Sequence, residues 1–446
     1  MSFVISADSP IRFTAALPEA ADVVVIGGGI AGVMSAYYLA LAGKKVVLCE
    51  KGRIAGEQSS RNWGWIRQQK RDPAELPIMI ESLRLWQGLA AQLPPDLGFR
   101  QCGVAYTTHD PAQMEGYARW VALAAEHGVE SRLLGRADLQ ALAPNSAGWV
   151  GGLITPSDAR AEPFVAVPML AELAQAAGVT IIENCAVRGL DRVAGQVAGV
   201  VTELGRIAAP QVLLAGGAWS SIFARREGVE LPQLMVRSTV GQTAPMPEIT
   251  QVSNADNVFA WRRRLDGGYT LAPGTWHDFF IGPDAFRHLD AYLPQIRRDI
   301  SKTAMRPWSP ERGWPDGWTT HRNWSQDRET PFEAMRVLDP APNLKRLREV
   351  QDAFARAFPG LGRPRLLRAW AGMIDVMPDT VPVLDQSPLT GFWVATGLSG
   401  HGFGIGPGVG RVMADLMCGR PAGHDMTRFR FGRFTDGSKI DLGPTF

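Results

Sequence analysis

The segment at residues 49–69 combines residue types that can bind and orient a small molecule. A carboxylate accepts hydrogen bonds, hydroxyl and guanidinium groups donate them, and indoles offer flat apolar faces. A coil that only connected two elements would not need this combination. The segment therefore indicates a binding site, whose nature depends on the elements before it. In chain order, its candidate residues are Glu50, Ser59, Ser60, Arg61, Trp63 and Trp65.

A β-branched run, a glycine motif and an apolar helix pattern stand directly before this segment. Val23–Ile26 has the composition of a buried parallel strand, residues 30–42 have helical periodicity, and residues 44–49 form a second strand pattern. Between the first strand and the helix, residues 27–32 read G-x-G-x-x-G. This context predicts a βαβ dinucleotide-binding unit, because the glycines allow a tight turn and let a pyrophosphate approach the helix N-terminus.

Glu50 ends the second predicted strand, roughly 20 residues after the glycine motif. A carboxylate there accepts hydrogen bonds from a pair of ribose hydroxyls and would repel a 2′-phosphate. The alternative is a glycine-rich turn without a ligand. The residues predicted to contact the dinucleotide here are Gly27, Gly29, Ile30, Ala31, Gly32 and Glu50.

A second glycine-rich segment, GLSGHGFGIGP, lies near the carboxyl end. Phe392–Ala395 has the pattern of a strand, and Pro407 is expected to open a helix after an intervening loop. Backbone without side chains permits close approach to a flat ring, and a helix N-terminus favours an anion. The alternative is a flexible loop.

Composition indicates a globular chain long enough for two to three domains. The formal net charge is +2, so neither nucleic acid nor an acidic partner is expected. Four scattered cysteines favour reduced thiols in the cytosol and argue against a metal site. Residues 23–43 are uncharged and about as long as a membrane span, but their glycines divide them into strand and helix, so no transmembrane segment is expected.

The rest of the chain alternates helix and strand patterns without an internal repeat. Sheet is predicted over residues 236–282, where Asp-Gly-Gly at residues 266–268 is typical of a hairpin turn. The pattern favours a dinucleotide-binding unit interrupted by sheet-rich insertions. Further helices are predicted over residues 74–92, 111–128, 283–303 and 343–358.

These motifs, with AGGAWS at residues 215–220, resemble the D-amino acid oxidase and glycine oxidase superfamily of FAD enzymes. The stretches EKGRIAGEQSSR, NCAVRG, VLLAGGAWS and TPFEAMRV are most similar to bacterial membrane-bound L-amino acid deaminases. The resemblance spans about residues 20–434 and implies an α/β fold, in which a discontinuous Rossmann-type FAD-binding domain carries a mixed-sheet α+β substrate domain. It implies an FAD domain from residues 20–105, 150–235 and 340–446, a substrate domain from residues 106–149 and 236–339, and an N-terminal extension over residues 1–19.

The resemblance also implies that the segment after Glu50 follows the pyrophosphate and reaches the flavin ring. Covalent members of the superfamily place a cysteine near Gly372–Met373, and its absence here leads us to expect noncovalent FAD. Beyond the glycine motif and Glu50, the residues implied to contact FAD are Lys51, Ser59, Ser60, Arg61, Asn62, Trp63, Gly64, Val187, Ala215, Gly216, Trp219, Gly372, Gly397, Gly400, His401, Gly402, Phe403 and Gly404.

Arg262, Trp65 and His401 are expected to act on the substrate. Arg262 matches a substrate-binding arginine of the deaminases, and a guanidinium can grip a carboxylate through two parallel hydrogen bonds. The alternative is that residues 262–264 form a solvated charge run. Trp65 stands where the deaminases have a glutamine that helps to bind the substrate carboxylate, and it is expected either in the pocket or as a core anchor.

His401 follows Gly400 beside the expected flavin, where it would either tune amine oxidation or shape its loop. Asp375 and Asp379 are further candidates near the ring edge. The glycine oxidase branch often has an arginine two residues after the glycine that matches Gly372, and this chain has Ile374 there.

The implied reaction oxidises the C–N bond of an amino acid or amine to an imine, which water hydrolyses to an oxo product and ammonia or an amine. The expected partners are that small molecule and either dioxygen or a quinone-linked electron acceptor. Two alternatives stay open: an opine, secondary-amine or polyamine oxidase, including one subunit of a complex, and an FAD-binding subunit without turnover. Because the deaminases' amino-terminal membrane helix is missing, we expect a cytoplasmic protein.

Overall fold

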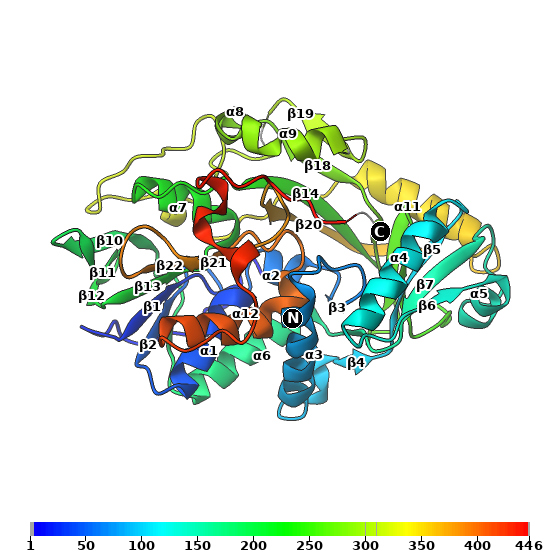
Figure 1. Cartoon of the computed structure of the whole chain (residues 1–446), viewed down its shortest axis with the longest axis horizontal. Coiled ribbons are helices and arrows are strands. Elements are labelled where there is room, and N and C mark those ends of the chain that lie inside the picture. The colour runs from blue at the N-terminus through cyan, green and yellow to red at the C-terminus, as the bar shows by residue number, and fades with distance from the viewer. Residues whose placement is uncertain (1–3, 299, 309, 445–446) are drawn as a thin grey trace.

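The computed structural model describes residues 4–298, 300–308 and 310–444, and it is built on two large sheets (Figure 1). The first sheet has six strands in the order β21-β22-β13-β1-β2-β9, all parallel except the β21–β22 pair. Its central strand, β1, is the buried run VVVI, as expected for a strand covered on both faces. The bounds are β1 (Val23–Ile26), β2 (Val46–Cys49), β9 (Thr180–Ile182), β13 (Gln211–Leu214), β21 (Val383–Gln386) and β22 (Phe392–Thr396).

Each face of this sheet carries its own hydrophobic layer, because successive strand residues point to opposite sides. Val23 and Val25 pack with helices α1, α6 and α12, whereas Val24 packs with the small sheet β10-β11-β12 and helix α7. The predicted βαβ unit and the α/β fold class are confirmed. The bounds are α1 (Ile30–Leu41), α6 (Pro163–Ala176), α7 (Ser220–Arg226), α12 (Gly402–Met417), β10 (Val187–Val193), β11 (Gln196–Thr202) and β12 (Gly205–Ala208).

The second sheet is mixed, with the order β19-β18-β14-β17-β16-β15-β5-β7-β6, and β20 also pairs with β14. Helix α11 (Leu344–Ala357) packs on it through Val350 and Phe354. The predicted hairpin turn at residues 266–268 joins β16 to β17. The bounds are β5 (Val104–Thr108), β6 (Arg132–Leu134), β7 (Gly151–Thr155), β14 (Leu234–Thr243), β15 (Ser253–Ala255), β16 (Phe259–Arg263), β17 (Tyr269–Pro273), β18 (His277–Phe280), β19 (Thr303–Arg306) and β20 (Leu366–Val376).

The remaining elements connect the two sheets or flank them (Figure 1). A small sheet, β3-β8-β4, lies beside the segment that carries the two indoles. Its strands and the remaining α-helices are β3 (Trp65–Ile66), β4 (Arg100–Gln101), β8 (Ala159–Arg160), α2 (Gln58–Arg61), α3 (Leu76–Ala90), α4 (Gln113–Glu126), α5 (Arg136–Leu142), α8 (Pro283–Arg287), α9 (Leu289–Arg298) and α10 (Pro331–Ala334).

The helix near the carboxyl end begins earlier than the sequence predicted. Helix α12 starts at Gly402, so Pro407 lies inside it instead of opening it. Ser82 of α3 bridges the irregular turn, because its Oγ donates to Gly404 O at 2.7 Å and accepts from Gly408 N at 3.1 Å. A Cβ at Gly406 would lie 2.6 Å from Ile30 Cγ1. Glycine therefore serves close packing of α12 against α1 and α3.

The predicted boundary at residue 340, where the chain returns from the substrate domain to the FAD-binding domain, stays a prediction. The residues directly after it nevertheless belong to the second sheet. Residues 340–376 supply α11 and β20 to the second sheet, and β20 pairs with β14 from Leu234↔Val376 to Thr243↔Leu366. A division that follows the sheets would place this boundary after β20. Within the described ranges, no helix is both long and apolar enough to cross a membrane.

Candidate active site

A cavity of about 380 Å³ lies where the carboxyl ends of β1, β2, β13 and β22 meet the second sheet. Ligands of open α/β sheets bind at such strand ends. Many of the residues singled out in the sequence line it together. They are Gly27, Gly29, Ile30, Ala31, Glu50, Lys51, Ser59, Arg61, Asn62, Trp63, Trp65, Val187, Ala215, Gly216, Trp219, Gly372, Gly400, Gly402 and Phe403.

The glycine motif lets the turn between β1 and α1 pack closely against the residue after β13. Gly27 has a φ of +110°, and a Cβ there would lie 2.5 Å from Ala215 O. A Cβ at Gly32 would lie 2.0 Å from Gly27 O. Since no side chain fits at either position, the N-terminus of α1 remains open to the cavity.

Glu50 ends β2 with its carboxylate held by backbone donors. Gly28 N donates to one oxygen at 2.6 Å, and Gly52 N donates to the other at 2.7 Å. Burial raises the pKa of Glu50 to about 7, although Lys51 and these two donors oppose the rise. Each oxygen keeps a free lone pair, so the group can still accept hydrogen bonds from a ligand.

Ser59 and Asn62 fix the loop after Glu50. The hydroxyl of Ser59 accepts from Ile30 N at 2.9 Å, and Asn62 accepts from Gly64 N at 2.8 Å. Arg61 donates to Gly56 O and pairs with Asp339. Contacts of these side chains to a cofactor stay predictions, and their visible role is to hold the loop.

The sequence did not single out Glu57, which organises this wall. Lys51 Nζ donates to Glu57 Oε1 at 2.7 Å and lies 4.4 Å from the centre of the Trp219 ring. The Trp219 indole also donates to Glu57, at 3.1 Å. Of the two partners of Glu57, only Lys51 is close in sequence, so the local sequence did not reveal the contact with Trp219.

Arg262 lies behind the cavity wall, which differs from its expected place. Its Nη1 and Nη2 donate to the two carboxylate oxygens of Glu162 at 2.9 and 2.8 Å, and its Nε donates to Trp63 O. The side chain is 2% exposed. Because Glu162 already occupies the bidentate face of the guanidinium, Arg262 is not available for a substrate carboxylate.

The turn after β3 places two other arginines, Arg67 and Arg71, in the cavity wall. Asp158 holds the turn, accepting from Gln68 N at 2.7 Å and from Gln69 N at 3.3 Å. Arg71 is 3% exposed, and its Nη1 is buried with no hydrogen-bond partner among the described residues. Burial, followed by the charge of Arg67, lowers the pKa of Arg71 to about 9.

Several comparisons place this geometry among known proteins. The family model described as "FAD dependent oxidoreductase", DAO, matches residues 22–416. The chain belongs to this family. It is 28% identical over 428 residues to sarcosine oxidase subunit beta from Rhizobium meliloti, covering 94% of this chain and 90% of the relative. It is 26% identical to a D-amino acid dehydrogenase from Paramagnetospirillum magneticum, covering 93% of this chain and 99% of that one. A solved L-amino acid deaminase from Proteus myxofaciens, in complex with anthranilate, superimposes with a TM-score of 0.90 at 27% identity, over 97% of both chains.

The cavity fits the FAD of the DAO family in its polar groups. Gln58 Nε2, Trp65 Nε1 and Arg71 Nη1 are donors in its wall that find no partner within the described residues. Buried donors without partners cost free energy, so a ligand rich in acceptors would satisfy them. FAD offers phosphate and ring oxygens. The predicted FAD dependence is confirmed at the level of the family.

Other predicted residues lie just behind the wall. His401, at the start of α12, makes a 3.1 Å contact through Nδ1 with Glu75, whose side chain is fully buried. Burial, followed by the charge of Arg71, lowers the pKa of His401, although the contact with Glu75 opposes this shift. Its role in chemistry stays a prediction. The predicted residues outside the wall are Gly32, Ser60, Gly64, Gly397, His401, Gly404 and Arg262.

The second sheet adds wall residues that the sequence did not single out. Ser238 of β14 lies in register with Gly372 of β20, and both line the cavity. Tyr106 of β5 and His277 of β18 also line it. Burial lowers the pKa of His277. Asp375 lines the cavity, whereas Asp379 pairs with Arg433. Ser238, Tyr106 and His277 carry no local motif, because only the pairing of distant strands brings them together.

Proposed function

We propose that the protein is an FAD-dependent oxidase or dehydrogenase of a substrate that carries both an amine and a carboxylate. The reaction converts the substrate C–N bond to an imine, which water then hydrolyses to an oxo compound and ammonia or an amine. FAD is held noncovalently and supplies the two-electron acceptor. The substrate class covers amino acids and N-alkyl amino acids.

The observation that carries the proposal is the buried, unpartnered Nη1 of Arg71 in the cavity wall. The charges of Glu75 and Asp158 partly compensate this buried cation, but its free donor is stabilised further when an anion with acceptor oxygens binds beside it. Arg67 of the same turn supplies a second guanidinium, which lies 5.3 Å from the ring centre of Tyr106. A carboxylate is the small organic anion whose geometry a guanidinium matches.

The same positive charge prepares the amine for oxidation. The amine must be neutral when its neighbouring C–H bond is oxidised. Arg67 and Arg71 in the wall disfavour an ammonium nearby, because like charges lower its pKa. The indoles of Trp63 and Trp65, whose ring centres are 5.1 Å apart, exclude water and add to this effect. The wall can therefore bind one end of the substrate as an anion and keep the other end uncharged.

The relatives support the substrate class. The names sarcosine oxidase and D-amino acid dehydrogenase denote enzymes of amino acids, and the solved deaminase holds anthranilate. Each of these small molecules carries a carboxylate. A polyamine lacks one and would leave Arg71 unpaired.

The test is to mix the purified yellow protein with candidate substrates without oxygen and to follow bleaching of its visible flavin band. The panel contains D- and L-amino acids, N-methyl amino acids, opines and polyamines. We expect bleaching only by compounds with a carboxylate. Bleaching by polyamines alone would contradict the substrate class, and a flavin that no amine bleaches would favour a binding subunit without turnover. Flavin that stays with acid-precipitated protein would contradict noncovalent binding.

A further inference from the structure

Residues 324–339, here named the strap, follow β19 of the second sheet but attach to the first half of the chain. The indole of Trp324 donates to Arg188 O at 2.7 Å, and Gln326 Nε2 donates to Leu190 O at 2.9 Å. At the other end of the strap, Asp339 pairs with Arg61. The strap therefore joins β10 to the loop after Glu50.

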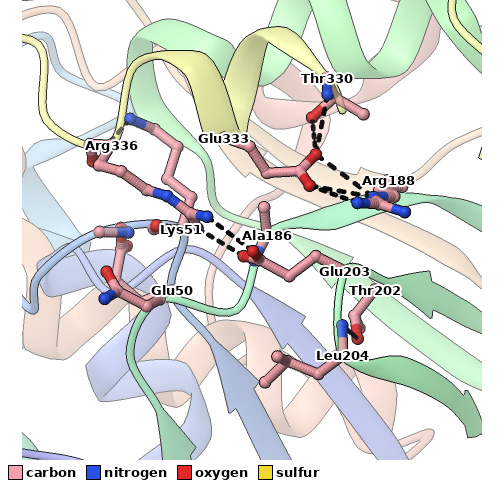
Figure 2. A network of polar contacts seen from close by, with 12 residues as sticks. Glu50, Lys51, Ala186, Arg188, Thr202, Glu203, Leu204, Thr330, Glu333 and Arg336 are labelled. Carbon is pink, nitrogen blue, oxygen red and sulfur yellow. Dashed lines mark hydrogen bonds and ion pairs between the residues drawn. The ribbon is translucent and has the colours of Figure 1, made fainter. Parts of the chain in front are cut away.

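Two ion pairs fasten the strap to the outer strands beside the first sheet (Figure 2). Arg336 Nη2 lies 2.6 Å from Glu203, whose carboxylate also accepts from Ala186 N at 2.7 Å. Arg188 and Glu333 form the second pair, with side chains 18% and 6% exposed. Glu333 also accepts from Thr330 N at 2.8 Å and so caps helix α10.

A third fastening ties the strap backbone to the residue after Glu50. Lys51 Nζ donates to Met335 O at 2.7 Å and Arg336 O at 3.0 Å, and Arg336 Nη1 returns a hydrogen bond to Lys51 O at 2.9 Å. A Cβ at Gly52 would lie 2.0 Å from Arg336 O. The strap thus lies directly against the loop that holds Glu50, as Figure 2 shows.

The strap also forms part of the cavity wall. Phe332 and Arg336 line the cavity together with Glu50, Val187 and Trp219. The Phe332 ring packs edge-on against that of Trp219, with centres 5.7 Å apart. A ligand that occupies the Glu50 end of the cavity would therefore contact the strap.

We propose that the strap retains FAD, with Arg336 as the positioning residue that fastens it over the Glu50 end of the cavity. The Arg336–Glu203 pair links Arg336, the only strap cation in the wall within the described residues, to the turn between β11 and β12. Breaking it loosens the fastening beside Glu50 while the other contacts of the strap remain. The inference rests on the FAD dependence of the family and does not depend on which substrate the enzyme oxidises.

The test is the rate at which flavin leaves the holoenzyme after dilution, followed by the fluorescence of released FAD and by gel filtration. Arg336→Met should accelerate release on the order of tenfold, the effect of one charge-assisted bidentate contact. Glu203→Gln should act in the same direction. Arg206→Met is the matched control, because Arg206 pairs with Asp191 on the same small sheet with 65% of its side chain exposed, and release should stay at the wild-type rate.

A cross-linked variant tests the strap without removing its ion pair. A Cβ at Gly56 would lie 3.2 Å from Val337 Cγ2, so Gly56→Cys with Val337→Cys places two thiols within reach of each other. Once thiol titration shows that the disulfide has formed, oxidised protein should release flavin more slowly than the same protein after dithiothreitol. Equal release in both states, or equal release by Arg336→Met and wild type, would overturn the proposal.

Discussion

Arg262 and Arg71 are both buried arginines near the same cavity, and they differ in their partners. Arg262 forms two hydrogen bonds with Glu162, whereas Arg71 keeps a buried nitrogen without one within the described residues. Although burial alone would raise it, the Arg262 guanidinium lowers the pKa of Glu162 to about 2, so the pair stays ionised. The comparison teaches that burial of a charge does not identify a ligand site. The more informative feature is a buried donor in the cavity wall that lacks a hydrogen-bond partner, because the carboxylates of Glu75 and Asp158 also act on the charge of Arg71.

The largest effect should come from breaking the complete pair. Glu162→Gln leaves the Arg262 charge buried without its anion, which should cost about 3–5 kcal/mol of unfolding free energy. The measurement is urea unfolding of the apoprotein. The double variant Glu162→Met with Arg262→Met is the control, and it should recover most of the loss because both charges are gone. A single variant as stable as wild type would mean that the pair is not desolvated.

The second-largest effect should come from Arg71, whose Nη1 has no hydrogen-bond partner within the described residues. Arg71→Met should lower kcat/KM for a carboxylate substrate by roughly 30- to 1000-fold, since losing one charge-assisted contact costs about 2–4 kcal/mol. Unfolding free energy should fall by less than in Glu162→Gln, because the loss is limited to the hydrogen bond from Nε to Arg67 O and the attraction between Arg71 and Glu75. Steady-state kinetics and the flavin spectrum check both points. If Arg71→Met instead lowers the unfolding free energy as much as Glu162→Gln while kcat/KM of the folded protein is unchanged, Arg71 has a structural role and does not bind the substrate.

The pH dependence sharpens the comparison further. Burial, with the charge of Arg67, lowers the pKa of Lys70 to about 7 and that of Arg71 to about 9. Lys70 Nζ lies 5.0 Å from the ring centre of Tyr106, which lines the cavity, and a bound carboxylate favours its protonated form. Affinity should therefore be greatest below pH 7 and fall as Lys70 loses its proton above pH 7, whereas the guanidinium groups stay protonated. The dissociation constant of an amine-free carboxylate such as benzoate should therefore rise on the order of tenfold over this range. Flavin absorbance reports binding, and Lys70→Met should flatten the curve.

The smallest effect is expected at Arg263, the neighbour of Arg262 on the opposite face of β16. It is half-buried and donates to Met246 O at 2.8 Å, and its guanidinium lies 5.0 Å from the ring centre of Tyr269. Arg263→Met should change kcat/KM by less than about twofold and unfolding free energy by less than about 1 kcal/mol. A loss of kcat/KM as large as that of Arg71→Met would show that the arginines act through their general positive potential and not through specific contacts.

Local sequence was enough to predict the βαβ unit at the base of the cavity. Gly27, Gly32 and Glu50 lie within one βαβ unit, whose strand, turn and helix follow from neighbouring residues. The start of α12 was predicted late, because Ser82 of α3 bridges the turn around Pro407 and no local pattern reveals that contact.

The substrate half could not be predicted in the same way. Whether Arg262 is free depends on Glu162, a hundred residues earlier in the chain. Arg71 becomes notable only once the turn held by Asp158 buries it. An arginine's role thus follows from its tertiary partners, and a resemblance matched position by position transfers the residue without transferring its surroundings.

The strand order of the first sheet has a consequence for biosynthesis. β1 forms near the start of the chain, but its neighbour β13 pairs with β22, and the cavity also needs Gly402 and Phe403. The ribosome must therefore synthesise the chain past Phe403 before the cavity around Gly27 can form. Such distant pairings fold slowly and leave strand edges exposed meanwhile. We expect newly made chains to depend on flavin supply, with excess apoprotein degraded or aggregated when flavin is scarce.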